Sequence, residues 1–334
     1  MSVTTRATRP ARAVPIVVAL HVLGIGGLAL APAFHGGSVA VLTGLGLAAY
    51  GLGLRHAFDP DHIATIDNTT RRLVRTGADS RGVGLWFSLG HSTVVIVAAL
   101  LLALGVRTLA PMLDDDSSVL REVTGVWGPL VASSFLLVIA AINLVLLRRA
   151  LRGSDPASPL VHHRAGGPVT WLLRRFEWAT DRPGRMYGVG VLFGLGFDTA
   201  TSIGLLAISA TASLNHESWL AAVPLALLFA AGMSALDSAQ GAVARRVYRW
   251  TPAATGGDRW QVRYDVLVTA VSALTALGIA IITLVQVVAE RAPAFAGIPG
   301  ASANLDPYGI VLTVVLLVAW GVGMLVLRQQ HRQA

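Results

Sequence analysis

The chain contains no cysteine and no lysine, and only 13% of its 334 residues are charged. Without cysteine, neither a disulfide framework nor a thiolate metal site can form. A water-soluble domain of this length would carry about twice as much charge, so a single soluble globule is excluded. Hydrophobic residues make up 54% of the chain. Because a helix crosses a bilayer with about 20 apolar residues, this composition predicts an all-α integral membrane protein.

Apolar stretches predict about eight transmembrane helices in a single polytopic domain over residues 1–334. They run from about 15 to 33, 40 to 66, 83 to 106, 127 to 147, 187 to 212, 219 to 243, 265 to 289 and 309 to 327. The first stretch follows a basic start and leads to Ala-Pro-Ala, so a cleaved secretory signal is the alternative for it. Its length and His21 in its middle favour a retained helix.

The 26 basic residues, all arginine, outnumber the 18 acidic ones and indicate the orientation of the chain. Arginines gather before the first span and in alternate loops after it, whereas the loops between hold only Arg107, Arg121 and Arg291. The positive-inside rule predicts cytoplasmic termini and a cytoplasmic Arg-rich loop over 148–186, in a bacterial inner membrane. Such an excess reports orientation and contact with membrane lipid, so no nucleic-acid partner is expected.

Polar and ionisable side chains enter the predicted spans in four clusters. Because they are costly inside a bilayer, each cluster is a candidate functional site. The clusters are 55–63 at the end of the second span, 87–92 in the third, 196–202 in the fifth and 232–238 in the sixth. Spans seven and eight are almost purely apolar inside and are expected to be scaffold.

The first cluster carries His56, Asp59, Asp61 and His62 within seven residues. Two imidazoles and two carboxylates form a nitrogen and oxygen donor set suited to a divalent transition metal. Pro60 removes a helix hydrogen bond and disfavours the helical conformation at Asp59, so the helix should bend and turn Asp61 toward the same cavity. The alternative is a helix end whose charges lie in interfacial water.

The remaining clusters contribute His91, Asp198, Ser202, Met233 and Asp237 as further candidate metal-binding residues. His91 lies at about the depth of the first cluster. Asp198 and Ser202 share a helix face by their i, i+4 spacing, and so do Met233 and Asp237. A buried carboxylate needs a cation, a proton or a helix N-terminus as a partner. We therefore expect one convergent metal site.

A short internal similarity suggests an inverted repeat that relates spans two and three to spans five and six. Phe87-x-x-Gly90-His91-Ser92 is similar to Phe229-x-x-Gly232-Met233-Ser234, and each follows a Phe-Asp pair by about thirty residues. Because the second span runs inward and the fifth outward, the repeat would be inverted, as in many transporters with a central site. Chance similarity is the alternative.

At these motifs the sequence resembles the nickel/cobalt transporter family of eight-span secondary permeases. The family patterns R-H-A-x-D-A-D-H-I, F-S-L-G-H-S-T-V-V, L-G-F-D-T-A-T-E-I and G-M-x-x-x-D-T-x-D are matched in order by residues 55–63, 87–95, 195–203 and 232–240. The chain differs at Pro60, Ser202, Ser238 and Gln240. The resemblance implies that His56, Asp61, His62 and His91 recognise the metal, and the carboxylates missing at 202 and 240 imply a lower affinity.

The resemblance implies a permease that moves Ni²⁺ or Co²⁺ across the cytoplasmic membrane, by uptake, with the metal as substrate and no resident cofactor. The chain has no G-x-x-x-x-G-K-[ST] phosphate loop, so it is not expected to hydrolyse ATP. Nothing in the sequence points to an ATPase partner. A membrane metalloenzyme would need a positioned base beside the metal, and no H-E-x-x-H motif is present. A transition-metal efflux protein or a membrane metal sensor could use the same histidines and carboxylates, so both functions compete with uptake.

Overall fold

The computed structural model describes residues 13–35, 38–103, 119–151, 178–195, 222–250, 259–295 and parts of 297–321. Every regular element in these residues is a helix, which confirms the all-α fold class. Five described helices are long and apolar enough to cross a membrane, namely α1, α4, α6, α10 and α11. The structure does not establish the predicted number of eight spans, and the predicted inverted repeat involves residues 196–221, which lie outside the described part.

The described helices follow the chain in this order: α1 (Ala13–His35), α2 (Val39–His56), α3 (Pro60–Arg75), α4 (Val83–Ala103), α6 (Val119–Leu151), α8 (Met186–Gly194), α10 (Ala222–Trp250) and α11 (Arg259–Arg291). Two short 3₁₀ turns, η1 (Pro183–Arg185) and η3 (Pro293–Phe295), flank α8 and α11. Helix α6 continues through Leu151, so the Arg-rich loop predicted from residue 148 begins with helical residues.

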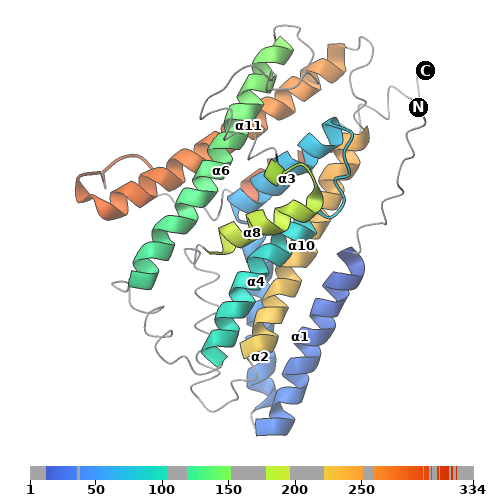
Figure 1. The fold of residues 1–334 in the computed structure, drawn as a ribbon, viewed down its shortest axis with the longest axis vertical. Coiled ribbons are helices and arrows are strands. Elements are labelled where there is room, and N and C mark those ends of the chain that lie inside the picture. Colours follow the sequence, from blue (N-terminus) through green and yellow to red (C-terminus); the bar gives the residue numbers. More distant parts are fainter. Residues whose placement is uncertain are drawn as a thin grey trace.

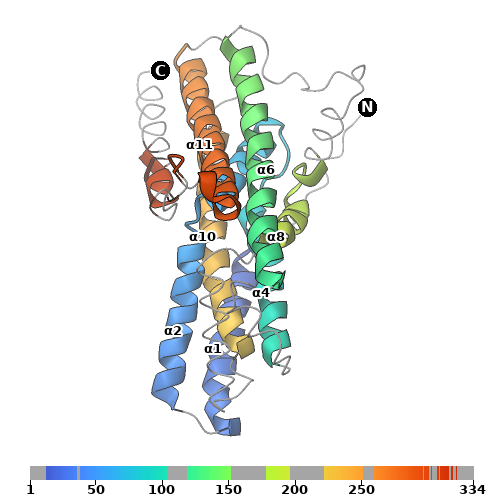
Figure 2. The same ribbon diagram turned by 90° about the vertical axis from the view of Figure 1, so that its left-hand side faces the viewer.

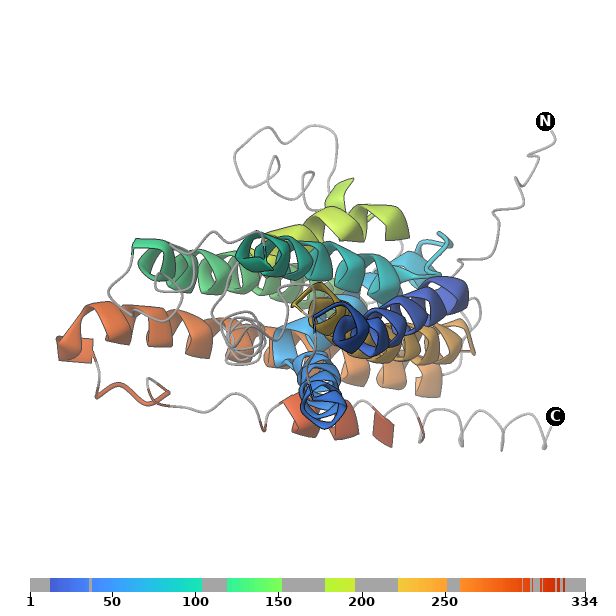
Figure 3. The ribbon, with the colours of Figure 1, turned by 90° about the horizontal axis from the view of Figure 1, so that it is seen from below.

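Helix α10 is the central element, because α1, α2, α3 and α4 all pack against it (Figure 1). Helices α6 and α11 form a second unit and run side by side (Figure 2). Helix α8 lies along the outer side of α4 (Figure 3). Helix α3 contacts both units, so it stands between the α10 group and the α6–α11 pair.

Among the described residues, three apolar clusters form the core. The first joins α1, α2, α4 and α10 around Phe229, the second joins α3, α6, α10 and α11 around Leu136, and the third joins α3, α4 and α8 around Phe87. Glycines bring the backbones together: a Cβ at Gly53 would overlap the Phe229 carbonyl, and a Cβ at Gly84 would overlap the Asp237 carbonyl. Small residues permit such close packing of membrane helices. Helices α2 and α4 are thereby held tightly against α10.

The predicted second span is broken where Pro60 occurs. Helix α2 ends at His56, and α3 begins at Pro60 after an extended N-cap residue, Asp59, with φ −61° and ψ 134°. The bend expected from Pro60 is thus confirmed. Helix α3 continues to Arg75, beyond residue 66, near which the apolar stretch of the predicted span ends. The second half of α3 is polar, and its composition predicts a loop. Contacts with neighbouring helices bury it.

The turn after α3 is short and structured. Gly77 and Gly82 adopt positive φ values of 69° and 79°, a conformation that favours glycine. The Arg81 guanidinium donates hydrogen bonds to Asp79 at 2.9 and 3.1 Å and holds the pKa of that carboxyl below its usual range. The turn thereby fixes the end of α3 and the start of α4.

Gly309 offers a direct test of the broken segment. A Cβ at this position would overlap the Phe58 carbonyl oxygen and would lie 3.3 Å from Pro60 Cδ. We expect Gly309→Ala to lower the stability of the purified protein by about 1–3 kcal/mol, because overpacking displaces backbone. Thermal unfolding in detergent measures the change. Gly278→Ala in α11, where a Cβ meets nothing within 4 Å, is the control, and equal melting temperatures for the two variants would contradict this interpretation.

Candidate metal site

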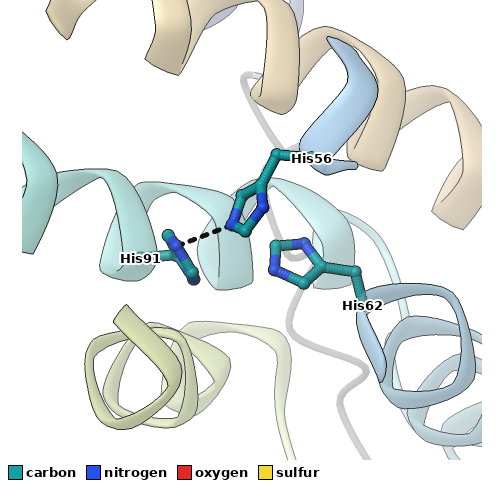
Figure 4. Close-up of side chains that lie close together, drawn as sticks. All are labelled: His56, His62 and His91. Atoms are coloured by element: carbon teal, nitrogen blue, oxygen red, sulfur yellow. Dashed lines mark hydrogen bonds between the residues drawn. The ribbon is translucent and has the colours of Figure 1, made fainter. Parts of the chain in front are cut away.

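Three buried histidines from three helices point toward one another (Figure 4). His56 ends α2, His62 lies in the first turn of α3, and His91 lies in α4. One ring nitrogen from each lies within 4.8 Å of the other two. His56 Nε2 and His91 Nε2 are 2.9 Å apart and share a hydrogen bond. The side chains are 1–3% exposed, so these imidazoles converge in the protein interior.

Two of the three imidazole rings have a carboxylate oxygen close to their Nδ1 atom. Asp59 Oδ2 lies 2.7 Å from His56 Nδ1, and Asp237 Oδ2 lies 3.5 Å from His62 Nδ1. Carboxylates at the outer nitrogen of a ligating histidine fix the orientation of the ring and raise its basicity. The broken turn supplies Asp59, whereas α10 supplies Asp237, so the second pairing depends on the packing of α10 against α3.

Asp237 is fully buried, and among the described residues neither of its carboxylate oxygens has a hydrogen-bond partner. Its Oδ2 lies 3.5 Å from Nδ1 of His62, a distance that allows a charge interaction. An ionised carboxylate buried without hydrogen bonds is costly unless a counter-charge is close. The charge of Asp237 is therefore suited to a cation held beside His62.

Asp61 has a local role at the start of α3. Its Oδ1 accepts a hydrogen bond from the backbone N–H of His62 at 2.9 Å. A carboxylate in the first turn of a helix also interacts favourably with the helix dipole. Asp61 therefore supports the helix end that carries His62.

Met233 and Gln240 lie one turn to either side of Asp237 on α10. Met233 is fully buried in the apolar cluster that contains Phe229. The Gln240 amide donates to the Ile63 carbonyl of α3 at 3.3 Å, so its side chain contacts a neighbouring helix. Two further candidate residues, Asp198 and Ser202, lie outside the described residues.

Sequence reasoning missed two aromatic rings that enclose the histidines. The ring centroids of Phe87 and His62 are 4.8 Å apart, and those of Phe229 and His56 are 5.6 Å apart. Phe87 is the first residue of one segment of the suggested repeat, and Phe229 is the first residue of the other. Their matching positions are a signal that could have identified them. Apolar rings around the imidazoles exclude water and lower the local dielectric constant, which strengthens the interaction of donor atoms with a cation.

Comparison with known proteins identifies the family. Residues 42–327 match the sequence model of NicO, described as high-affinity nickel-transport protein. The chain belongs to the NicO family. This confirms the resemblance inferred from the four motifs. No solved structure shows a significant match.

Nickel and cobalt transporters from several bacteria match this NicO chain over most of its length. The nickel transporter NixA of Staphylococcus aureus is 36% identical over 94% of this chain and 92% of the relative. The cobalt transport protein NhlF of Rhodococcus rhodochrous is 36% identical over 95% of this chain and 91% of the relative. The high-affinity nickel-transport protein NixA of Helicobacter pylori strain 26695 is 36% identical over 82% of each chain.

Proposed function

We propose that this protein is a multi-pass secondary permease of the cytoplasmic membrane that carries Ni²⁺ or Co²⁺ into the cytoplasm. The observation that carries this proposal is the buried triad of His56, His62 and His91. Imidazole and carboxylate donors suit late first-row divalent metals, whereas Mg²⁺ and Ca²⁺ prefer oxygen ligands. The names of relatives, a nickel transporter and a cobalt transport protein, support the same two ions.

The dimensions of the triad support the binding of one ion. Metal–nitrogen bonds are about 2.0–2.1 Å long, so two nitrogens on one ion lie at most about 4 Å apart. The three nitrogens lie within 4.8 Å of one another, and the rings therefore need to close by less than about 1 Å. In this proposal the three imidazoles bind the ion, Asp59 and Asp237 orient them, and Asp237 balances the charge.

The roles of the remaining candidates follow from the sequence motifs. Asp198, Ser202 and Met233 are proposed as residues that complete the site, and Asp61 as the support of α3. Family members with carboxylates at positions 202 and 240 would have a more acidic site, so this chain should bind its ion less tightly. Selectivity for Ni²⁺ or Co²⁺ then depends on imidazole.

The orientation and the energy source follow from charge. The arginine distribution supports cytoplasmic termini, a cytoplasmic loop over 148–186 and a single polytopic domain over 1–334. A divalent cation that enters a negative interior gains about 4.6 kcal/mol at about 100 mV. This energy drives accumulation without ATP. The family has a transport function, so we propose no catalytic role, and the metal is cargo rather than a cofactor.

Radioactive metal measurements in intact cells test the proposal. We expect cells that express the protein to accumulate more ⁶³Ni²⁺ or ⁵⁷Co²⁺ than cells with an empty vector, and the increase to collapse when the membrane potential is dissipated. Lower accumulation than in the vector control would indicate efflux instead. Metal binding by the purified protein without flux into liposomes would indicate a sensor. Competition by unlabelled Ni²⁺, Co²⁺ and Mg²⁺ measures the selectivity.

A further inference from the structure

The middle of α3 meets α6 and α11 through buried polar side chains, next to the apolar cluster around Leu136. Asn68 Oδ1 accepts hydrogen bonds from Asn143 Nδ2 of α6 at 2.6 Å and from Ser272 Oγ of α11 at 2.8 Å. Arg71 donates to Asn68 Oδ1 at 3.0 Å and to Asn143 Oδ1 at 2.7 Å. These four side chains are 3–7% exposed. We call this contact of α3 with α6 and α11 the polar seam.

Two hydroxyl groups extend the polar seam toward the histidines. Thr65 lies one turn before Asn68 and one turn after His62 on α3. Ser133 lies on the stripe of α6 that ends at Asn143, and Leu136 on the same stripe packs in one apolar cluster with residues 63 and 64 of α3. The helix spacing thus places Thr65 between His62 and the polar seam, and Ser133 on the α6 stripe that meets α3, next to the apolar cluster around Leu136.

Both hydroxyls are fully buried and have no hydrogen-bond partner in the described part of the chain. Other described threonines, Thr43 and Thr93 among them, donate to the carbonyl four residues earlier. A buried hydroxyl without a partner costs about 1–3 kcal/mol. Thr65 and Ser133 are therefore stabilised whenever water or a hydrated ion enters the polar seam.

The contacts of α10 with α1, α2 and α4 are mainly apolar, around Leu225 and Phe229, although a hydrogen bond joins Ser88 of α4 to Ser234 of α10. Opening such a contact to water costs about 25 cal/mol for each Å² of apolar surface. Opening a hydrogen-bonded contact exchanges protein partners for water, at a net cost of about 0.5–1.5 kcal/mol per bond. The polar seam adjoins the apolar cluster around Leu136, but its own hydrogen-bonded part is less costly to open to water than an apolar contact.

Helix α3 is a separate helix at this place. Its first residue follows the break after α2, so α3 is not a rigid continuation of α2. His62 lies in its first turn and Asn68 in its middle. A shift of α3 away from α6 and α11 would therefore part the polar seam and withdraw one imidazole from His56 and His91 together.

We propose that the polar seam is the inner gate and release pathway for the transported ion. This inference rests on the proposed transport function. The hydrogen bonds of Asn68 with Asn143 and Ser272 close the gate, and their exchange for water opens it. Amide and hydroxyl oxygens then replace part of the hydration shell of the divalent cation, as polar groups that line ion pathways do.

Cysteine accessibility tests the gate directly, because the chain has no cysteine of its own. Ser133→Cys and Thr65→Cys each introduce a single thiol, in α6 and in α3. The probe is a membrane-impermeant trimethylammonium methanethiosulfonate, added to inside-out vesicles during Ni²⁺ transport. Ala226→Cys is the matched control, since Ala226 is equally buried but lies in the apolar cluster of α10.

We expect Ser133→Cys and Thr65→Cys to react at least about tenfold faster than Ala226→Cys from the cytoplasmic face, because thiol reactivity follows exposure to water. Modification should also block Ni²⁺ flux, and reduction should restore it. If Thr65→Cys does not reach the membrane, Ser133→Cys decides alone. Reaction as slow as that of Ala226→Cys, or reaction from the outer face only, overturns the proposal.

The same preparations separate failure of the gate from failure of the proposed function. If the wild-type protein moves no Ni²⁺ in cells or vesicles, transport itself is wrong. If the wild-type protein transports Ni²⁺ but both cysteines stay unreactive, transport stands and the ion leaves by another route.

Discussion

Replacement of His62 by alanine is expected to abolish high-affinity Ni²⁺ uptake. His62 is the one imidazole of the triad supplied by α3, and His56 and His91 alone leave a site with two nitrogen ligands. Loss of an outer-shell partner costs about 10–100-fold in metal affinity, so loss of a ligand should exceed about 100-fold. Uptake of ⁶³Ni²⁺ at low concentration, normalised to the amount of protein in the membrane, measures the effect.

His21→Ala is the matched control for this prediction. His21 lies on α1, where its ring contacts the Val17 carbonyl at 2.8 Å and the Tyr50 hydroxyl at 3.3 Å. His21 is, like His62, a histidine within a helix, but it is not part of the triad. Normal uptake by membrane-localised His62→Ala or His56→Ala protein would refute the assignment.

Asp237→Asn is expected to lower Ni²⁺ affinity by about 10–100-fold, the cost of losing an outer-shell carboxylate. The substitution keeps the shape of the side chain and removes only the charge that stands behind His62. Isothermal titration of purified protein with Ni²⁺ measures the affinity directly, apart from transport. The melting temperature of the metal-free variant shows that the fold is intact.

Asp67→Asn is the matched control for Asp237→Asn. It tests whether removing any buried carboxylate of this region lowers Ni²⁺ affinity, or only removing Asp237. Asp67 is 1% exposed and accepts a hydrogen bond from the Tyr248 hydroxyl at 2.6 Å, on the part of α3 that packs on α10. Asp67→Asn should leave the Ni²⁺ affinity within about threefold of wild type, because Asp67 already has a protein partner. Equal losses of affinity in the two variants would contradict a special role for Asp237.

Local physics made the break between His56 and His62 predictable. Pro60 cannot donate the helix hydrogen bond, and it disfavours the helical conformation at Asp59, so a break between His56 and His62 follows from the sequence. The polar clusters in four of the predicted spans also indicated that these spans converge on one site. Neither argument could pair His62 with Asp237, because that contact depends on how closely α10 approaches α3 and α4 at Gly84.

The second half of α3 escaped prediction for a physical reason. Hydropathy scores residues one at a time, so Asn68 and Arg71 have the composition of a cytoplasmic loop. In the structure Asn143 and Ser272 provide their hydrogen-bond partners, and both partners lie more than seventy residues away along the chain. The apolar spacing of Ile63, Ile66 and Leu73 is the signal that could have extended the helix.

The sequence by itself determined that this protein is an all-α membrane protein, that Pro60 breaks a helix, and that the chain carries the motifs of the nickel/cobalt transporters. These properties depend on composition, on the local backbone and on short runs of residues. Only the tertiary structure decided which imidazoles converge, that Asp237 lies beside His62, and that α3 meets α6 and α11 through polar side chains. Contacts between distant segments depend on the packing of whole helices, and local sequence does not encode that packing.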